Sequence, residues 1–207
     1  MSINQLARHL RRGRAQDFHQ HLEELEAAGE PLTLEGETFK ELTLDGFHLR
    51  GINLTNVEFE TCELRQVRLE GCTLDGTYIH DTKLDDCDLS ACTGQGFALE
   101  ACTVDRSRLK GMELESVEWT TTTFLDCELQ GLTLAEALLE ELTFQGGRFE
   151  QVEMTDGELS FVTLRESQYA GQLELADCTT NRCYVADDST QEPPEGFARK
   201  SGRRRTL

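Results

Sequence analysis

Closely spaced carboxylates are the side chains that could give this sequence a function. They come in three short runs, whose members are Asp85, Asp86, Asp88, Glu113, Glu115, Glu118, Glu136, Glu140 and Glu141. Paired carboxylates can serve acid–base catalysis where a cleft perturbs a pKa, whereas solvated carboxylates present negative charge to a basic partner. We therefore take these nine residues as candidate partner-binding residues.

No pattern in the sequence predicts a catalytic, cofactor-binding or metal site. The sequence lacks the nucleophile elbow G-x-S-x-G, the phosphate-binding P-loop and the zinc motif H-E-x-x-H. His19 and His21 lie in one predicted helix and point to different faces, and His9, His48 and His80 are scattered. The sequence therefore predicts a protein without enzyme activity, cofactor or metal ion.

The negative charge is concentrated in the middle of the chain. The net charge is −19. Residues 30–188 hold 33 acidic and 11 basic side chains, residues 1–29 are neutral overall, and residues 189–207 carry +3. Such a body repels nucleic acid and attracts basic surfaces, so we expect no direct nucleic-acid partner, even through the basic tail. An acidic surface can also serve solubility alone, and this alternative stays open.

The sequence has a period of five residues. Every fifth residue from Leu34 to Tyr169 is apolar or aromatic, except Gly94, and the residue two places before each of these central positions is mostly small or apolar. A helix needs apolar spacings of three and four, and a strand needs two, so neither fits alone. Two inward residues in five suit a short extended segment followed by a corner, which stacks the chain into coils.

The cysteines fit the inner positions of such coils. Six lie two residues before a central position: Cys62, Cys72, Cys87, Cys92, Cys102 and Cys127. Cys178 and Cys183 join them if the register slips by one residue near Gly171, which makes Leu175, Thr180 and Val185 central. Spacings in multiples of five do not match a zinc knuckle. We expect buried reduced thiols, although Cys72 and Cys92 fall on adjacent coils, close enough for a disulfide.

Segments such as CDLSA, CELQG, INLTN and CTLDG match the A(D/N)LXX consensus of the pentapeptide-repeat family, which the sequence resembles from about Leu32 to Val185. In that family four pentapeptides make one square coil of a right-handed β-helix. The resemblance implies an all-β solenoid of about seven to eight coils, in which central residues four repeats apart form four columns. Gly94 leaves a gap in its column, which we expect Phe97 or Trp119 to fill.

The ends of the chain differ from the repeats. Residues 2–28 read as helical, with a break at Gly13 and an end at Gly29, and Ser2 and Gln5 have the spacing of a capping box. An open first coil exposes unpaired backbone groups, which a helix can cover. We therefore predict a helical cap over residues 1–29, the β-helix over residues 30–188 and a flexible basic tail over residues 189–207.

The charge and the family resemblance favour three functions. The first is a non-catalytic interaction module that presents an acidic rod to a protein partner. The second is a DNA mimic that binds a type II topoisomerase (DNA gyrase or topoisomerase IV) and protects it from inhibitors, as some members of the family are regarded as doing. The third is an effector or accessory protein of a bacterial secretion system.

The sequence indicates where the protein resides and how it associates. It has no apolar run long enough to span a membrane and no apolar core of a signal peptide, so we expect a cytoplasmic protein. Secretion without a conventional signal stays open. We expect a monomer or a homodimer, the latter through Phe149, Phe161 and Tyr169 near the last repeats.

Overall fold

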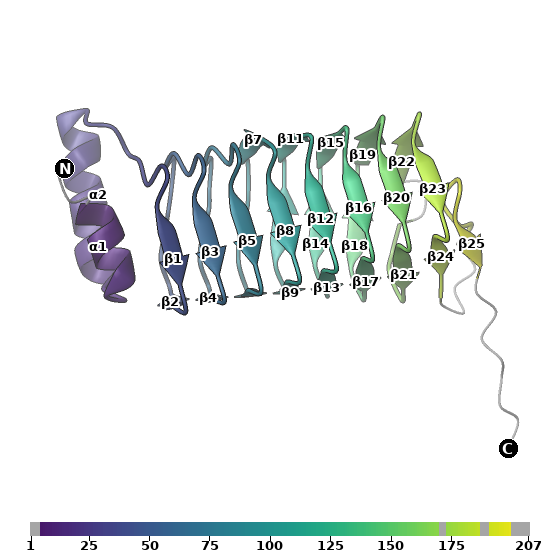
Figure 1. Ribbon diagram of the computed structural model, residues 1–207, viewed down its shortest axis with the longest axis horizontal. Helices are drawn as coiled ribbons and strands as arrows, with labels where there is room; N and C mark the ends of the chain where they lie inside the picture. Colours follow the sequence, from purple (N-terminus) through teal and green to yellow (C-terminus); the bar gives the residue numbers. More distant parts are fainter. Residues whose placement is uncertain (1–4, 170–172, 187–190, 200–207) are drawn as a thin grey trace, which may run out of the picture.

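The structure is a computed structural model, which describes residues 5–169, 173–186 and 191–199. In these residues the chain forms two helices followed by a parallel β-solenoid of about seven turns, seen from the side in Figure 1. The helices are α1 (Gln5–Arg11) and α2 (Ala15–Ala28). This confirms the predicted solenoid with helices at its N-terminus, while Ser2 of the expected capping box lies outside the described residues.

Both helices bury an apolar side, and α2 meets the first coil. The buried side chains of the two helices are Leu6, Ala7, Leu10, Phe18 and Leu22. The ring of Phe18 packs edge-on against Phe47 with centroids 5.4 Å apart, and Nε2 of His19 accepts a 2.8 Å hydrogen bond from the backbone N–H of His48. The helices therefore cover the end of the rod where the first strands would otherwise be exposed.

Four parallel sheets form the faces of the rod, which we number in the order in which the chain meets them. Face 1 contains β7 (Thr93–Gln95), β11 (Glu113–Glu115), β15 (Thr133–Ala135), β19 (Val152–Thr155) and β22 (Leu173–Ala176). Face 2 contains β1 (Thr38–Lys40), β3 (Glu58–Glu60), β5 (Tyr78–His80), β8 (Ala98–Glu100), β12 (Glu118–Thr120), β16 (Leu138–Glu140), β20 (Glu158–Ser160) and β23 (Thr179–Asn181).

The other two faces complete each coil. Face 3 contains β2 (Thr43–Asp45), β4 (Glu63–Arg65), β6 (Lys83–Asp85), β9 (Thr103–Asp105), β13 (Thr123–Leu125), β17 (Thr143–Gln145), β21 (Thr163–Arg165), β24 (Tyr184–Val185) and β25 (Ala198–Arg199). Face 4 contains β10 (Arg108–Lys110), β14 (Glu128–Gln130) and β18 (Arg148–Glu150). In the earlier coils, isolated β-bridges connect successive coils within face 1 and, separately, within face 4.

The strand register confirms the predicted columns. Leu44 pairs with Leu64, and Phe124 pairs with Phe144, so each inward residue meets the one four repeats later. After Tyr169 the spacing grows by a single position, because Leu164 pairs with Val185. The one-residue slip predicted near Gly171 is therefore present, although residues 170–172 themselves lie outside the described residues.

Corner residues explain why the period is five. Between consecutive strands the chain passes through a residue with positive φ, such as Thr61 at 54° or Asp126 at 50°. That left-handed conformation redirects the backbone onto the next face. Most strands have three residues, of which the middle one points inward: Leu64, Leu84 and Phe124 are each only 1% exposed. The interior is consequently one narrow core that runs along the rod.

Gly94 lies where the backbone of face 1 changes its geometry. In the first three coils, N–H groups of Glu37, Val57 and Thr77 close tight turns on the carbonyl three residues earlier, with N···O distances of 2.9–3.1 Å. From Gly94 on, strands replace these turns. A Cβ on Gly94 would lie 2.8 Å from the carbonyl carbon of Leu74. The backbone of Leu74, rather than the expected ring of Phe97 or Trp119, therefore occupies the place of the missing side chain.

Buried hydroxyl groups bind backbone N–H groups inside the rod. The Thr82 hydroxyl accepts a 3.0 Å hydrogen bond from the N–H of Cys62 and donates one of 2.8 Å to the carbonyl of His80. Ser107 and Thr122 accept hydrogen bonds in the same way from the N–H groups of Cys87 and Cys102. The inner small residues therefore supply acceptors as well as filling space.

Replacing Thr82 with valine should lower the free energy of unfolding by about 1–3 kcal/mol, because the N–H of Cys62 loses its acceptor in a buried site. Thr82→Ser keeps the hydroxyl and should lose only about 0.8 kcal/mol for the missing methyl group. Urea unfolding followed by circular dichroism compares the two variants. Equal losses would show that the hydroxyl contributes nothing beyond packing.

The end of the chain differs from the expected flexible tail over residues 189–207. Within its described part, residues 191–199, β25 pairs with β24 through Tyr184↔Ala198, and Phe197 is buried. A short polar segment thus adds one more strand to face 3. Residues 200–207, with most of the basic side chains of the predicted tail, lie outside the described residues.

Candidate functional site

The solenoid decides which charged side chains lie together. On each strand the two residues that flank the inward one point outward, and so does the following corner residue. Outward residues four repeats apart therefore stack into columns along the rod, as the registers Glu58↔Tyr78 and Glu113↔Thr133 illustrate. On such a surface the neighbours of a side chain are the residues four repeats before and after it, whereas residues close together in the sequence can lie on different faces.

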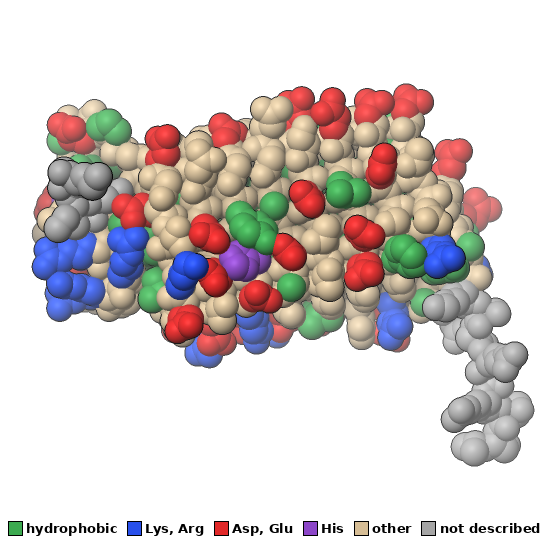
Figure 2. All heavy atoms as spheres, viewed as in Figure 1, with side chains coloured by type: hydrophobic (Ala, Val, Ile, Leu, Met, Phe, Trp, Pro, Cys, Tyr) green, Lys and Arg blue, Asp and Glu red, His purple; other side chains and the backbone are tan. Residues whose placement is uncertain are grey.

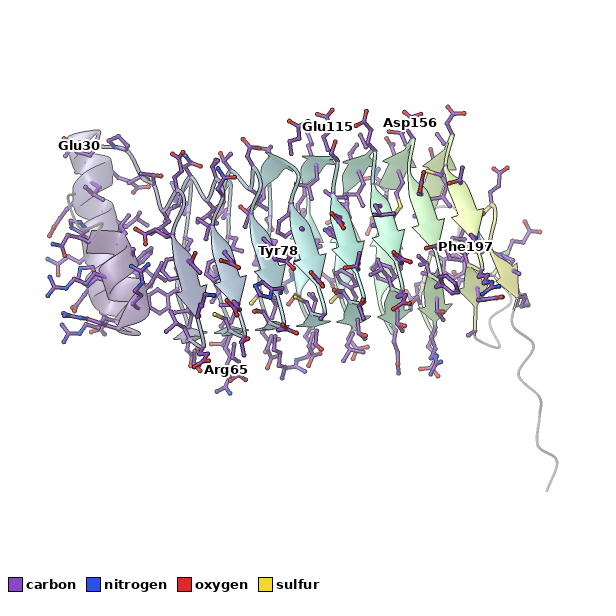
Figure 3. All side chains as sticks on the ribbon, in the orientation of Figure 1. Glu30, Arg65, Tyr78, Glu115, Asp156 and Phe197 are labelled. Atoms are coloured by element: carbon purple, nitrogen blue, oxygen red, sulfur yellow. The ribbon has the colours of Figure 1, made fainter. Side chains whose placement is uncertain are left out.

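Face 1 and its corner are acidic, and their described residues include no lysine or arginine. The acidic side chains are all exposed: Glu35, Asp75, Glu113, Glu115, Glu136, Glu153, Asp156, Glu174 and Asp177. None of these described carboxylates forms an ion pair. Figure 3 labels Glu115 and Asp156 on the top edge of the rod, and Figure 2 shows acidic side chains along the same edge.

The densest acidic surface combines faces 1 and 2 over three successive coils. It consists of Glu113, Glu115, Glu118, Glu136, Glu140, Glu141, Glu153, Asp156 and Glu158, and we call it the acidic strip. All nine side chains are exposed, and the described outward residues of these two faces in these coils include no basic side chain. The strip thus presents three unpaired carboxylates per coil.

The structure brings together six of the nine predicted residues. Glu113, Glu115, Glu118, Glu136, Glu140 and Glu141 all belong to the acidic strip. The sequence prediction did not include Glu153, Asp156 and Glu158, although they are spaced three and two residues apart. The repeat offered the signal, because Asp156 follows Glu136 by four repeats and therefore stacks on it.

The other three predicted residues lie on different faces beside basic side chains. Arg106 contacts Asp85 closely, and its Nε lies 3.4 Å from Asp86. Lys83 is 3.6 Å from Asp85. Asp88 lies on face 4, where its backbone pairs with those of Arg68 and Arg108 on the neighbouring coils, and its Oδ1 accepts a close hydrogen bond from the Ser90 hydroxyl. Asp85 and Asp86 are therefore largely neutralised, Asp88 lies in a column with two arginines, and none of the three adjoins the strip.

Basic side chains gather on the side of the rod away from face 1. They belong to faces 3 and 4 and include Arg50, Arg65, Arg68, Lys83, Arg106, Arg108, Lys110, Arg148 and Arg165. Figure 3 shows Arg65 on the edge opposite Glu115 and Asp156. The rod is consequently polarised across its width, with negative charge on one side and mixed charge on the other.

Comparison with known proteins identifies the repeat. The family model described as pentapeptide repeats matches residues 52–90 with 8 copies. Two structures of QnrB1, a plasmid-mediated fluoroquinolone resistance protein, superpose with TM-scores of 0.63 and 0.52 at 13% and 15% identity. The first alignment covers 82% of this chain and 92% of QnrB1, and the second covers 70% and 83%.

Residues 52–90 therefore contain pentapeptide repeats, as the sequence resemblance predicted. HetL, a pentapeptide repeat protein from the cyanobacterium Nostoc sp., aligns over 81% of this chain and 83% of its own at 12% identity, with a TM-score of only 0.39. No curated protein matches the sequence. At these identities the solved structures establish the fold of this pentapeptide-repeat protein and nothing about its partner.

The aromatic surface expected to form a dimer is smaller than predicted. Phe149 and Tyr169 are each 2% exposed, so they belong to the interior of the pentapeptide-repeat rod. Phe161 is 40% exposed, and the guanidinium of Arg182 lies 5.3 Å from its ring centroid. Because the fifth-residue spacing already predicted that Phe149 and Tyr169 point inward, only Phe161 remains of the expected patch.

The cysteines of this pentapeptide-repeat protein are free thiols, and all but Cys178 are buried. Burial raises the pKa of Cys87 and of Cys102 to about 11 and that of Cys127 to about 12. These three thiols therefore stay protonated at neutral pH, and a protonated thiol is neither a nucleophile nor a metal ligand.

His80, one of the scattered histidines of the sequence, has two carboxylates beside it in the structure. Nε2 of His80 on β5 lies 3.2 Å from Oε1 of Glu58 on β3, and Glu60 lies on the same side of that strand. The histidine follows the second glutamate by four repeats, a spacing that could have revealed this group once the columns were known.

Neither helix in the described part of the chain is long and apolar enough to cross a membrane.

Proposed function

We propose that this pentapeptide-repeat protein is a non-catalytic interaction module that docks its acidic strip against a cationic protein surface. The observation that supports it most is the strip itself, nine exposed carboxylates on three successive coils without a basic side chain among them. The carboxylates are carried by hydrogen-bonded strands of a rigid stack, so little backbone order has to be gained on binding. Such a module fits the cytoplasmic residence predicted from the sequence.

The one-sided distribution of charge favours docking over solubility as the reason for the acids. Stacked like charges destabilise neighbouring strands. Glu136 and Asp156 stack in one corner column with Asp177 beyond them, whereas on face 4 the column alternates as Arg108, Glu128 and Arg148. Solubility needs polar residues but no segregation of their sign, and the alternating column shows that the fold accommodates mixed charge.

Affinity capture with the full chain tests this proposal. We expect a captured protein with a basic surface, released as NaCl is raised from about 0.1 M to 1 M, because the screening length falls from about 10 Å to about 3 Å. Mass spectrometry of the eluted fractions identifies it. Capture that persists unchanged in 1 M NaCl would point to an apolar contact and contradict docking through carboxylates.

The spacing of the charges favours DNA mimicry as the second candidate. Three carboxylates per coil, with a rise of roughly 4.8 Å per coil, give about one negative charge per 1.6 Å along the strip. Double-stranded DNA carries one per about 1.7 Å. The similar fold of QnrB1, a fluoroquinolone resistance protein, also favours this second candidate. The partner would then be a type II topoisomerase, DNA gyrase or topoisomerase IV, with a cationic groove for DNA.

A supercoiling assay with purified DNA gyrase separates the two candidates. For a DNA mimic we expect the protein to restore supercoiling in the presence of a fluoroquinolone, and to inhibit the enzyme at higher concentration by competing with DNA. No change over a wide titration, with and without the drug, would reject gyrase mimicry while leaving docking on another cationic protein intact. The same assay with topoisomerase IV and decatenation covers the related enzyme.

A further inference from the structure

We propose that Glu58, Glu60 and His80 on face 2 form a binding site for a divalent transition-metal ion, with Zn²⁺ as the ion that fits best. One ligand atom from each of these side chains lies within 4.8 Å of the others. Imidazole nitrogen with carboxylate oxygens is a donor set that Zn²⁺ accepts, whereas Mg²⁺ and Ca²⁺ prefer oxygen alone. The site shares no residue with the acidic strip, so it does not depend on the proposed function.

Two neighbouring strands hold the three ligands in place. β3 pairs in parallel with β5, and Glu60 lies directly opposite His80 in the register. Glu58 precedes Glu60 by two residues, so both carboxylates point to the same side of β3. The backbone is therefore already arranged, and only side-chain rotation is needed to close around an ion.

The distances suit a tetrahedral ion. Bonds of about 2.0–2.1 Å from Zn²⁺ to nitrogen and oxygen place neighbouring ligand atoms about 3.4 Å apart. Nε2 of His80 and Oε1 of Glu58 are 3.2 Å apart. The third ligand atom, a carboxylate oxygen of Glu60, lies within 4.8 Å of the other two, so its side chain has to turn toward them to complete the site.

The surroundings of His80 orient the ring for this role. Oδ2 of Asp81 lies 3.5 Å from Nδ1 of His80, on the side away from Glu58. The Tyr78 ring, labelled in Figure 3, stacks on the imidazole with centroids 4.5 Å apart. A carboxylate at one ring nitrogen leaves the other for the metal, the usual arrangement around metal-bound histidines. In Figure 2 a histidine side chain lies among acidic ones on the face turned to the viewer.

Lys40 is the competitor for this site. It lies opposite Glu60 in the register of β1 and β3, and its ammonium group forms a close ion pair with that carboxylate. An incoming cation has to displace the ammonium group, so removing Lys40 should strengthen binding.

Isothermal titration of the full chain, free of any affinity tag, with Zn²⁺ tests the proposal. We expect one ion per chain, an affinity about tenfold or more lower in His80→Asn and in Glu58→Gln, and an affinity about threefold or more higher in Lys40→Met. The gain in Lys40→Met is the sharpest readout, since misfolding cannot produce it. Glu118→Gln, which removes an exposed carboxylate of β12 on the same face, is the matched control and should bind as the parent protein does.

Three results would overturn the site. One is the absence of binding by the parent protein up to about 1 mM Zn²⁺. The second is an unchanged affinity in His80→Asn, which would assign the ion elsewhere. The third is an equal loss in Glu118→Gln and Glu58→Gln, which would indicate diffuse attraction to the acidic surface. Every variant retains all eight cysteines, so differences between variants cannot come from the thiols.

Discussion

Replacing Phe124 with alanine should lower the free energy of unfolding by about 3–5 kcal/mol. Phe124 is 1% exposed, its ring lies parallel to Phe144 with centroids 4.6 Å apart, and Trp119 is 5.5 Å away. The interior is one narrow core whose walls are hydrogen-bonded ladders. Because those walls cannot move inward without breaking hydrogen bonds, the cavity left by the ring should persist.

Phe161→Ala is the matched control, because it removes the same ring from the surface of the same rod. Phe161 is 40% exposed, so we expect a change within about 1 kcal/mol. Urea unfolding should be followed by circular dichroism and by the fluorescence of Trp119, the single tryptophan, which must report the same transition if the rod unfolds as one unit. Similar losses in both variants would contradict a stabilising interior at Phe124.

The sequence was sufficient to predict the core of this rod. Inward residues such as Leu44 and Phe124 pair with the inward residue four repeats later, as the period of five requires. Even the slip that places Val185 against Leu164 was predictable, because a strand shifted by one residue would turn its whole inward set to solvent. Burial of apolar side chains is a strong constraint, and it acts at every repeat.

The features that escaped prediction depend on backbone contacts between coils. Gly94 interrupts its column because the carbonyl carbon of Leu74 approaches the place where a Cβ would lie. That approach follows from a change in turn geometry, which composition does not encode. Likewise, β25 pairs with β24 although its segment is polar and lies beyond the last recognisable repeat.

The candidate site was half predictable for a related reason. Runs of acids in the chain pointed to Glu113, Glu115 and Glu118, which do lie together. The run at Asp85, Asp86 and Asp88 also passes around one corner, but Arg106 forms ion pairs with Asp85 and Asp86, and Asp88 shares its column with Arg68 and Arg108. Columns of residues from successive coils decide which charges lie together on this fold, so a linear run of acids does not show whether basic side chains stack beside it.

Neutralising three carboxylates of the acidic strip, by Glu115→Gln, Glu136→Gln and Asp156→Asn, should weaken binding to the captured cationic partner about tenfold to a hundredfold. The three side chains lie on face 1 in successive coils without an ion pair. If each contributes about 0.5–1 kcal/mol to the complex, the sum corresponds to that loss. Titration calorimetry or surface plasmon resonance at about 0.1 M NaCl measures it.

The control for this variant is Glu70→Gln, Glu128→Gln and Glu150→Gln on face 4, which changes the net charge by the same amount. Equal losses in the two triple variants would show that net charge, and not the strip, attracts the partner.

The strip variant should also melt at a higher Tm than the parent protein at low salt, because Asp156 stacks beside Glu136 and next to Asp177 in one column. Raising the NaCl concentration should remove that gain, since salt screens the repulsion. Higher stability together with weaker binding is the result expected of acids that the fold tolerates and the function requires.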